Sequence, residues 1–532
     1  MSSSERLLLS GNEAVARAAC DASVSLGTGY PGTPSTEILE AFPRFGGNAQ
    51  WAPNEKVALE VGIGAAFGGS RVLVTMKHVG VNVAADPLFA VAHTGVDGAL
   101  VIVSADDPGM ASSQNEQDNR RYAAFAGMPM LEPSDSQEAY DLAIEGFKIS
   151  ERFDSPVMLR LTTRICHSKG VVHTRDVPPP EKAPGYRPAP RERVMMPANA
   201  RPAHRRMRKR VEKIRQWNED CSLNEVIRGD ESLGIISSSV AFTHAREAAP
   251  DASFLKLGFS YPLPFEKIRR FANSVDRCVV IEENDPYLAE ALRAEGLDVD
   301  DKAEEFRFGE LNVSRVRSIL GSNEEKAPEE RPAGRPPRLC PGCPHRSSFE
   351  VLRDLDCIVT GDIGCYTLGA LKPFEAMDTC LCMGASIGAG LGLRHVLPEA
   401  EARRVVSVIG DSTFVHSGLT GIAEMVYNPP PTGHVVVVLD NGTTAMTGLQ
   451  EHPATGRTLE GAPTHQMDIE KVCLAMGVDR VETVDPVKET QSFSDLVEDA
   501  RQSNECTVII SRRPCVLAMK KRKKEERKER SQ

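Results

Sequence analysis

The sequence predicts a multidomain α/β protein whose parallel sheets are flanked by helices. Short apolar runs typical of buried strands recur along the chain, as at 71–76, 99–104, 405–410 and 434–440. Segments with helical spacing and glycine-rich turns separate these runs, which is the order of elements in α/β domains. With 532 residues, the chain has room for three or four domains with substantial cores.

Two changes of composition divide the chain. From about 171 to 230 the sequence turns proline-rich and then strongly charged, which predicts a surface linker followed by a helix near 204–218. A second stretch of proline and charged residues predicts another linker. We expect a first α/β domain at 1–175, a linker and helix at 176–230, a smaller α/β domain at 231–325, a linker at 326–337, a third α/β domain at 338–518 and a basic tail at 519–532.

The composition narrows the classes of protein that the chain could represent. A formal charge of −11 argues against general nucleic-acid binding. No apolar run reaches the roughly 18 to 20 residues that cross a bilayer, so we expect no membrane span. The N-terminus lacks the basic-then-apolar order of a signal peptide, which predicts a cytoplasmic protein. Thirteen cysteines, an odd number without an export signal, indicate reduced thiols and possible metal ligation.

Two polar residues follow neighbouring strands of the third domain. Asp411 directly follows the apolar run at 405–410, and Asn441 directly follows the run at 434–440. Residues 413–427 between them have the apolar spacing of a helix. A right-handed crossover would bring both strand ends to one rim of the sheet, where open α/β sheets bind ligands. Mg²⁺ prefers oxygen ligands and leaves positions for phosphate oxygens, so the pair suits a metal-bound diphosphate. The alternative is that both are ordinary turn residues.

This segment resembles the thiamine-diphosphate motif, in which GlyAsp is followed about thirty residues later by Asn. In that family the Asp side chain, the Asn side chain and a backbone carbonyl two residues further on hold the metal. The sequence departs from the pattern at Ser412, where many members have Gly. The resemblance implies that the Mg²⁺ ligands are Asp411, Asn441 and Thr443, and that further cofactor contacts come from Gly410, Ser412 and Met446.

A pyrimidine-binding half is also expected, because thiamine diphosphate normally lies between two domains, and segment 54–71 is the candidate. Asn54 can cap a helix whose first turn carries Glu55. The chemistry requires a carboxyl group at the pyrimidine ring nitrogen, and five residues along a helix leave Glu55 and Glu60 about 140° apart, so they cannot share this role. Resemblance to the pyrimidine domains of 2-oxoacid dehydrogenases and oxidoreductases favours Glu55, with Glu60 as the alternative. Glu55 could also simply stabilise the helix N-terminus.

Two further segments of the first domain could reach the same site. The turn TyrProGlyThrProSer at 30–35 is stiffened by its prolines and could present the Thr33 hydroxyl to a ligand. It resembles the TyrProxThrPro turn of pyruvate:ferredoxin oxidoreductase, where the Thr contacts the substrate carboxylate. Lys77 and His78 follow a buried-looking strand, and a structural histidine is as plausible as a catalytic one at position 78.

CysProGlyCys at 340–343 places two thiols in one tight turn, a geometry shared by zinc and iron–sulfur sites. The same motif opens the thiamine domain of 2-oxoacid:ferredoxin oxidoreductases, which continues to a GlyIleGlyCys turn and ends with ProCys. This resemblance implies one 4Fe-4S cluster, with a structural zinc as the alternative, and leaves Cys380 and Cys382 as packing thiols. The implied ligands are Cys340, Cys343, Cys365 and Cys515.

Over nearly its whole length the chain resembles the large (alpha) subunit of indolepyruvate:ferredoxin oxidoreductases. The most specific stretches lie at 75–87, 112–120, 340–346 and 445–453. The resemblance implies a pyrimidine-binding first domain, a transketolase C-terminal-like second domain and a diphosphate-binding third domain. It also implies oxidative decarboxylation of aryl pyruvates with coenzyme A, a smaller beta subunit as partner, and ferredoxin as electron acceptor. Non-oxidative decarboxylation to an aldehyde is the alternative activity, and a non-catalytic assembly subunit is a third reading.

The C-terminus departs from this family pattern. The family alpha subunit usually ends in a ferredoxin-like module, whereas this sequence stops after Cys515 with a short basic tail. Electrons would then leave the cluster directly to an external carrier or through another subunit. The basic tail could be a solvated chain end without a specific role. The functional hypothesis is that it helps to dock an acidic ferredoxin.

Overall fold

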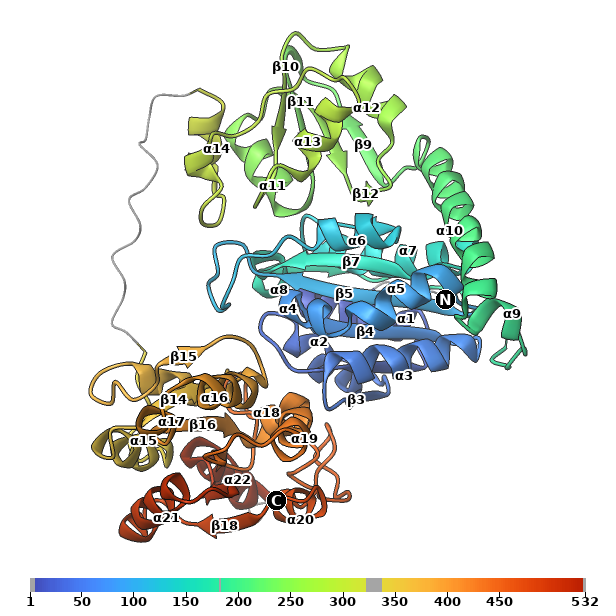
Figure 1. The fold of residues 1–532 in the computed structure, drawn as a ribbon. Helices are drawn as coiled ribbons and strands as arrows, with labels where there is room; N and C mark the ends of the chain where they lie inside the picture. Colours follow the sequence, from blue (N-terminus) through green and yellow to red (C-terminus); the bar gives the residue numbers. More distant parts are fainter. Residues whose placement is uncertain (1–4, 181–182, 322–336, 530–532) are drawn as a thin grey trace. The chain divides into compact units, whose positions relative to one another are not determined.

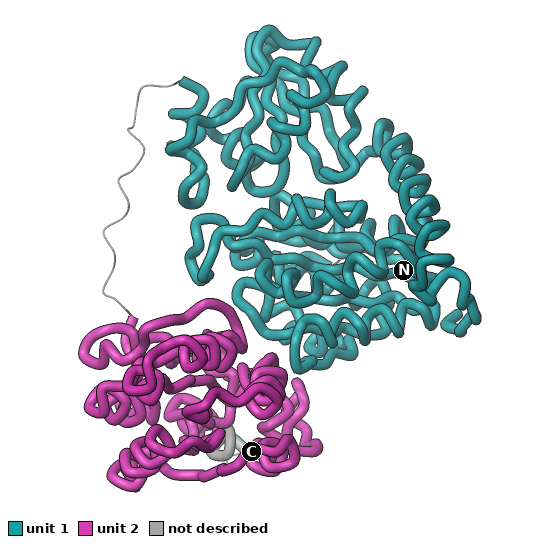
Figure 2. Tube along the Cα trace, viewed as in Figure 1, with its two compact units in different colours: residues 1–331 teal, residues 332–532 magenta. Residues whose placement is uncertain are grey.

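The computed structural model describes residues 5–180, 183–321 and 337–529. The chain divides into two compact units, residues 1–331 and 332–532 (Figure 2). The linker predicted at 326–337 lies outside the described residues, except for its last residue. Within the described residues, no helix is long and apolar enough to cross a membrane.

The first unit is built on a seven-stranded sheet (Figure 1). All its strands are parallel except β12 at the edge, which is antiparallel to β6. The central strands are buried at every residue because helices cover both faces. In sheet order the strands are β12 (Phe259–Tyr261), β6 (Met130–Leu131), β7 (Val157–Thr162), β5 (Ala99–Asp106), β4 (Arg71–Lys77), β2 (Leu26–Gly29) and β3 (Ala49–Trp51).

Two apolar cores cover the two faces of this sheet. Alternate strand residues point to opposite faces, so Val72 and Val74 join one core while Leu73 joins the other. Helices α3 (Glu55–Phe67) and α5 (Ala85–Thr94) pack in the first core, and α1 (Gly11–Asp21), α2 (Thr36–Ala41) and α7 (Ser136–Phe153) in the second. Shorter elements complete the layer: α4 (His78–Val83), α6 (Arg120–Ala126), α8 (Thr163–His167), α9 (Pro190–Arg193) and the antiparallel pair β1 (Arg6–Ser10) and β8 (Lys169–His173).

A four-stranded sheet forms the rest of the first unit. The predicted helix near 204–218 is present as α10 (Pro197–Asn218), which begins earlier than expected and leads into this sheet (Figure 1). A buried ionic network joins the two sheets: Arg120 contacts Glu282 at 2.6 Å, and Arg160 donates to Asn284 at 3.1 Å. The elements are β13 (Cys278–Ile281), β10 (Asp230–Ser237), β11 (Ala252–Leu257) and β9 (Asn224–Ile227), with α11 (Ser239–Ala248), α12 (Phe265–Ala272), α13 (Tyr287–Ala294) and α14 (Val313–Ile319).

The second unit contains a six-stranded sheet in which every pair is parallel. Helices α15 (His345–Asp354) and α21 (Thr490–Gln502) cover one face, and α16 (Ala385–Val396), α19 (Leu419–Tyr427) and α20 (Ile469–Ala475) cover the other. The strands in order are β15 (Thr379–Cys380), β14 (Ile358–Gly361), β16 (Val405–Gly410), β17 (His434–Asp440), β19 (Cys506–Arg512) and β18 (Arg480–Val484). These sheets confirm the predicted α/β class.

The helix predicted at 413–427 extends from Asp411 to Tyr427, and its hydrogen-bonding pattern changes along its length. It begins as α18 (Asp411–Thr413), passes through a π-helical turn at Phe414–Gly418 and continues as α19. Single π turns occur frequently at functional sites, because they re-aim the side chains around them. The basic tail is helical rather than irregular, since α22 runs from Val516 to Glu529.

The buried His434 gives the second unit a pH-dependent stability. Its Nε2 lies 2.8 Å from the Ser407 hydroxyl, and burial lowers the pKa of this imidazole well below its ordinary value. The unfolded chain takes up a proton near pH 6.5 but the folded unit does not, so stability present at pH 7 is lost as the pH falls. Between pH 7 and pH 5 we expect the free energy of unfolding to fall by at most about 2 kcal/mol through this group, a limit set by the histidine pKa in the unfolded chain.

Hydrogen exchange of peptides from β16 and β17, measured at both pH values, tests this expectation after correction for the intrinsic exchange rates. His434→Gln should lose less protection on acidification than the natural chain. His465→Gln, at an exposed position, is the control and should behave like the natural chain. An unchanged pH response in His434→Gln would contradict the assignment.

Candidate active site

The second unit brings Asp411 and Asn441 together at the carboxyl edge of its sheet. Strands β16 and β17 are adjacent and parallel, and both side chains are buried. The Asp411 carboxylate accepts hydrogen bonds from the N–H of Ser412 at 2.9 Å and of Gly442 at 2.7 Å. The Asn441 side-chain oxygen accepts from the N–H of Thr443 at 3.1 Å. The turn after β17 therefore holds both side chains, and the start of α18 also holds Asp411.

The backbone around this pair suits an Mg²⁺–diphosphate group. Gly442 has a φ of 70°, and no described atom lies within 4 Å of the position that a Cβ would occupy, so a ligand can approach its backbone. A Cβ at Gly410 would meet the Tyr366 ring at 2.6 Å, which explains why glycine is needed there. An acidic and an amide oxygen beside an open glycine turn match the donors that Mg²⁺ and phosphate require.

Two histidines that sequence analysis did not single out contact this pair. His345 Nε2 accepts a hydrogen bond from the Asn441 side-chain amide at 3.1 Å, and burial lowers the pKa of His345 to about 4, which keeps it a neutral acceptor. His452 Nε2 lies 3.3 Å from the Asp411 carboxylate. Both histidines belong to stretches that carry the family resemblance, which is the signal that could have identified them.

The charge of Asp411 is maintained despite its burial. Desolvation by itself would raise the pKa of this carboxyl group, but His452 and the backbone donors outweigh desolvation and lower the pKa below its ordinary value. The group is thus ionised in the neutral pH range, as a metal ligand must be.

The other predicted cofactor residues lie around the same turn. Ser412 Oγ and Thr444 Oγ1 are 2.7 Å apart, which ties the start of the helix to the turn after β17. Thr443 is buried, and its hydroxyl donates to the Gln450 carbonyl at 3.2 Å. Met446 is 51% exposed, so it lies at the surface of the loop.

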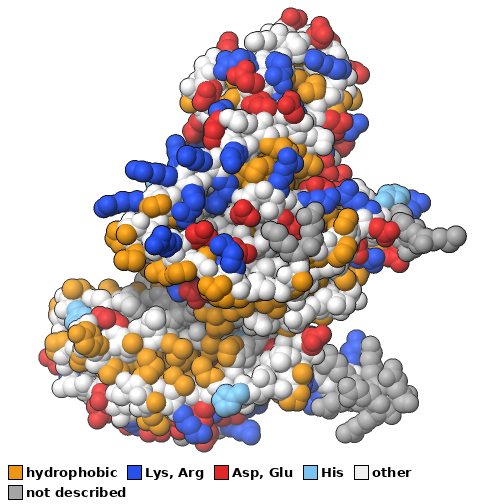
Figure 3. All heavy atoms as spheres, turned by 90° about the vertical axis from the view of Figure 1, so that its right-hand side faces the viewer, with side chains coloured by type: hydrophobic (Ala, Val, Ile, Leu, Met, Phe, Trp, Pro, Cys, Tyr) orange, Lys and Arg blue, Asp and Glu red, His pale blue; other side chains and the backbone are white. Residues whose placement is uncertain are grey.

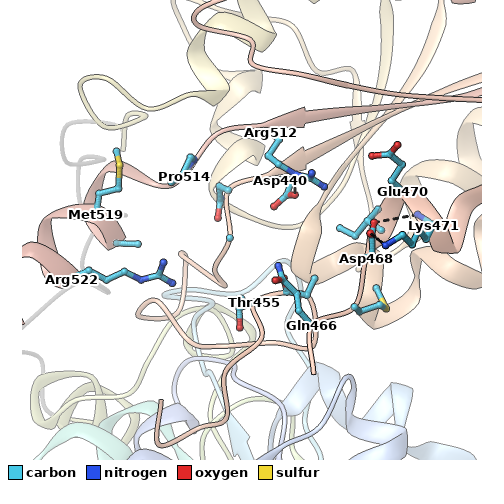
Figure 4. A pocket seen from close by; sticks show the side chains of 16 residues that line it. Asp440, Thr455, Gln466, Asp468, Glu470, Lys471, Arg512, Pro514, Met519 and Arg522 are labelled. Carbon is cyan, nitrogen blue, oxygen red and sulfur yellow. Dashed lines mark hydrogen bonds and ion pairs between the residues drawn. The ribbon is translucent and has the colours of Figure 1, made fainter. Parts of the chain in front are cut away.

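A cavity of about 520 Å³ adjoins Asn441 and Gly442 (Figure 4). Figure 4 shows Asp440 and Arg512, which are ion-paired at 2.7 Å, on neighbouring strand ends. Asp468 and Lys471 from the start of α20 form a further part of the wall. Helix α22 closes another side, so the C-terminal helix contributes to a cavity beside the candidate diphosphate site.

Four cysteines predicted to act together lie near one another in the second unit. Burial, and then the neighbouring thiols, raise the pKa values of Cys343 and Cys365 to about 11. The Cys515 N–H donates to the Asn441 carbonyl at 2.9 Å, which links the last cysteine directly to the candidate diphosphate site. Because thiolates are the ligating form, binding of a metal or cluster must release protons from these groups.

The cysteines are not already arranged around a single metal ion. Among the residues that the structure describes, no three His, Cys, Asp or Glu side chains converge as ligands of one ion. Cys380 is half-buried, with its thiol donating to the Asp362 carbonyl at 3.4 Å, whereas Cys382 is exposed rather than packed.

The two candidate glutamates of the first unit differ in how deeply they are buried. Glu55 begins α3 after the Asn54 cap and is 5% exposed. Its carboxylate packs against Gly80 of α4, where an added Cβ would lie only 2.6 Å from the carboxylate oxygen. The Glu60 side chain is 45% exposed and is ion-paired with Lys56 on the outer surface of the helix. Only Glu55 is therefore directed into the unit.

Lys77 and His78 are buried at the carboxyl end of β4. The Lys77 ammonium donates to the Ser112 carbonyl at 2.6 Å, and His78 Nε2 lies 3.3 Å from the Asn115 carbonyl. Desolvation lowers the pKa of both groups below their ordinary values. Thr33 is half-buried on the turn after β2. This turn packs against Lys77, because a Cβ added at the neighbouring Gly32 would lie 3.0 Å from the Lys77 Cβ.

Two protein-family models match the chain. The model described as "Pyruvate flavodoxin/ferredoxin oxidoreductase, thiamine diP-bdg" matches residues 17–222. The model described as "Thiamine pyrophosphate enzyme, C-terminal TPP binding domain" matches residues 362–511. Together with the fold and the Asp411–Asn441 site, these matches define the class of protein as a thiamine-diphosphate-dependent 2-oxoacid oxidoreductase.

Curated relatives make the family more specific. "Indolepyruvate oxidoreductase subunit IorA" of Archaeoglobus fulgidus is 38% identical over 561 residues, which cover 98% of this chain and 89% of that protein. The subunit of the same name from Methanothermobacter marburgensis is 39% identical over 547 residues, covering 97% and 87%. "2-oxoglutarate synthase subunit KorA" of Methanothermobacter thermautotrophicus is 26% identical and covers 53% of this chain and 88% of that protein. The chain belongs to the family of indolepyruvate oxidoreductase IorA subunits, which confirms the predicted resemblance.

Proposed function

We propose that this chain is the thiamine-diphosphate-bearing subunit of an enzyme that converts aryl pyruvates of the indolepyruvate type and coenzyme A to aryl-acetyl-CoA and CO₂. Electrons pass through an iron–sulfur cluster to ferredoxin. The buried Asp411–Asn441 pair beside the open Gly442 turn is the observation that carries the proposal. The names of the full-length relatives supply the substrate class.

The proposed cofactor ligands follow from the strand ends. The Asp411 carboxylate, the Asn441 amide oxygen and the Thr443 carbonyl would hold Mg²⁺ and through it the diphosphate. His345 and His452 act as positioning residues, since one contacts Asn441 and the other Asp411. Bound thiamine diphosphate supplies the electron sink for decarboxylation of the 2-oxoacid.

The proposed pyrimidine and substrate contacts come from the first unit. Glu55 would hold a proton at the pyrimidine ring nitrogen, a role that its burial supports and that the exposure of Glu60 does not. Thr33, Lys77 and His78 would bind the substrate carboxylate, because a hydroxyl and nitrogen donors complement that anion. The domain roles then follow: pyrimidine binding in 1–175, a transketolase C-terminal-like fold in 231–325 and diphosphate binding in 338–518.

The four cysteines would ligate one 4Fe-4S cluster. Neighbouring thiols help to raise the pKa values of Cys343 and Cys365, which supports a set of cysteines close enough to share one cluster. A smaller beta subunit would complete the enzyme, and ferredoxin or another carrier protein would accept the electrons.

An anaerobic assay of the chain co-expressed with its partner subunit tests the proposed activity. With thiamine diphosphate, Mg²⁺, indolepyruvate, coenzyme A and ferredoxin, we expect acyl-CoA formation together with ferredoxin reduction. Release of the aldehyde with no reduced acceptor would establish a non-oxidative decarboxylase instead. Absence of thiamine diphosphate binding would leave only an assembly role.

Replacement of Cys515 by Ser tests the cluster. The natural protein should contain about four irons per chain and show a substrate-reduced paramagnetic signal, because a cubane cluster needs four thiolates. Cys515→Ser should lose most of the iron and the signal, while the exposed Cys382→Ser should retain both. Zinc without iron in the natural protein, or full iron in Cys515→Ser, would contradict the proposed ligand set.

A further inference from the structure

A second cavity lies in the first unit, on the edge of the seven-stranded sheet where the strands begin. Its volume is about 860 Å³, within the range of small-molecule pockets. The lining residues Gly69, Asp97 and Asp154 lie two or three residues before the starts of β4, β5 and β7. Six of the residues in its wall are cationic and three are acidic. The cations are Arg152, Arg187, Arg206, Lys209, Arg210 and Lys213.

Most of the acidic charge in this cavity is already neutralised. Asp97 and Glu192 both contact Arg187, at 3.1 and 2.8 Å, and Asp97 is also paired with Arg193. In contrast, three cations from α10 form no ion pair with any residue that the structure describes: Arg206, Lys209 and Lys213. The cavity therefore carries an excess of positive charge in a protein whose formal charge is −11.

The sequence of α10 concentrates this charge. The helix contains eight lysines and arginines and one acid, Glu212. Positions 206, 209, 210 and 213 lie three and four residues apart, so they share one face of the helix, which is the face that lines the cavity. Like charges at these spacings repel one another, and a bound anion would remove that repulsion. Lys and Arg side chains gather on the side of the molecule turned to the viewer in Figure 3.

Two arginines in the wall of the cavity are held by contacts with neighbouring elements. Arg210 donates to the carbonyl of Asp154 at 3.1 Å and to that of Ala92, so it fastens α10 to the ends of α7 and α5. Burial lowers the pKa of Arg210 to about 10, which leaves it charged at neutral pH. Arg152 lies over the Trp217 ring at 5.2 Å, a contact that holds a further cation at the rim.

We propose that this cavity binds the polyphosphate chain of a nucleotide, at a site separate from the active site. Phosphate oxygens would take the places of the missing carboxylates around Arg206, Lys209 and Lys213. Lys77 lies at the opposite end of β4, and a strand of seven residues spans roughly 20 Å. Because the cavity lies at the end of β4 away from Lys77, a nucleotide bound here would regulate or stabilise the enzyme rather than serve as its substrate.

Calorimetric titration of the complete chain with ATP tests the proposal, with thiamine diphosphate and Mg²⁺ already saturating so that the cofactor site is filled. We expect ATP to bind, tripolyphosphate to compete with it and adenosine to have no effect. The double variant Lys209→Gln/Lys213→Gln should bind ATP at least about 10-fold more weakly, because each lost charge-assisted hydrogen bond costs more than 1 kcal/mol.

The matched control removes two positive charges from the same helix outside the cavity. Arg205→Gln/Arg208→Gln should bind ATP within about twofold of the natural chain, since neither residue lines the cavity. ATP should also raise the melting temperature of the natural chain and of the control but not of the cavity variant. The proposal is overturned if ATP does not bind, or if both variants lose the same affinity, which would indicate general attraction to a basic helix. Equal melting temperatures without ATP exclude misfolding as the cause.

Discussion

Asp411→Asn is expected to weaken binding of Mg²⁺ and thiamine diphosphate by about 100-fold, the equivalent of nearly 3 kcal/mol. The substitution keeps the size of the side chain and one acceptor oxygen. It removes the charge that His452 and two backbone N–H groups stabilise in the folded unit. A neutral amide is a poor ligand for a hard cation, so the metal and the diphosphate it holds should be lost together. Titration calorimetry of cofactor binding at saturating Mg²⁺ measures the effect.

Asp495→Asn is the matched control for this substitution. Asp495 is exposed on α21 of the same unit, outside the cavity, and accepts a hydrogen bond from the Gln491 side-chain amide at 2.8 Å. Asparagine keeps an acceptor oxygen there, so neither stability nor cofactor affinity should change. Cofactor affinity in Asp411→Asn equal to that of the natural chain would refute the assignment of Asp411 as a metal ligand. A reduced affinity in both variants would point to a general effect of charge on the second unit.

Glu55→Gln is expected to lower the turnover of 2-oxoacid by at least about 100-fold, which is within the usual range for loss of one general acid–base group. Glutamine fills the same buried space beside Gly80 but cannot exchange a proton with the pyrimidine ring. Cofactor affinity should fall much less than turnover, because the proposed diphosphate contacts, Asp411 and Asn441, belong to the second unit. Steady-state kinetics and cofactor titration on the same preparation separate the two effects.

Glu60→Gln provides the comparison on the same helix. Because Glu60 is exposed and paired with Lys56, its replacement should leave turnover within about twofold of the natural chain. If Glu60→Gln were the inactive variant and Glu55→Gln the active one, the assignment of the two glutamates would have to be exchanged. Loss of folded protein in Glu55→Gln would be visible as a lower melting temperature and would be distinguished in that way.

The sequence by itself determined the α/β class and the adjacency of the strands that end at Asp411 and Asn441. Both follow from local patterns, namely apolar strand runs and helical spacing, together with the right-handed crossover that parallel strands require. The family resemblance was carried by short motifs whose residues are close in the chain. Strand runs, helical spacing and short motifs can be recognised in a sequence without knowing how the elements pack.

Only the tertiary structure decided which side chains are buried and which distant residues meet. Periodicity placed Glu55 and Glu60 on different faces of a helix, but the packing of α4 against α3 was needed to show which face is buried. The contact between His345 and Asn441 joins residues 96 positions apart, and the cationic cavity joins α10 to strand beginnings far away in the sequence. These contacts depend on how helices pack over a sheet, which is a property of the whole fold and not of any one segment.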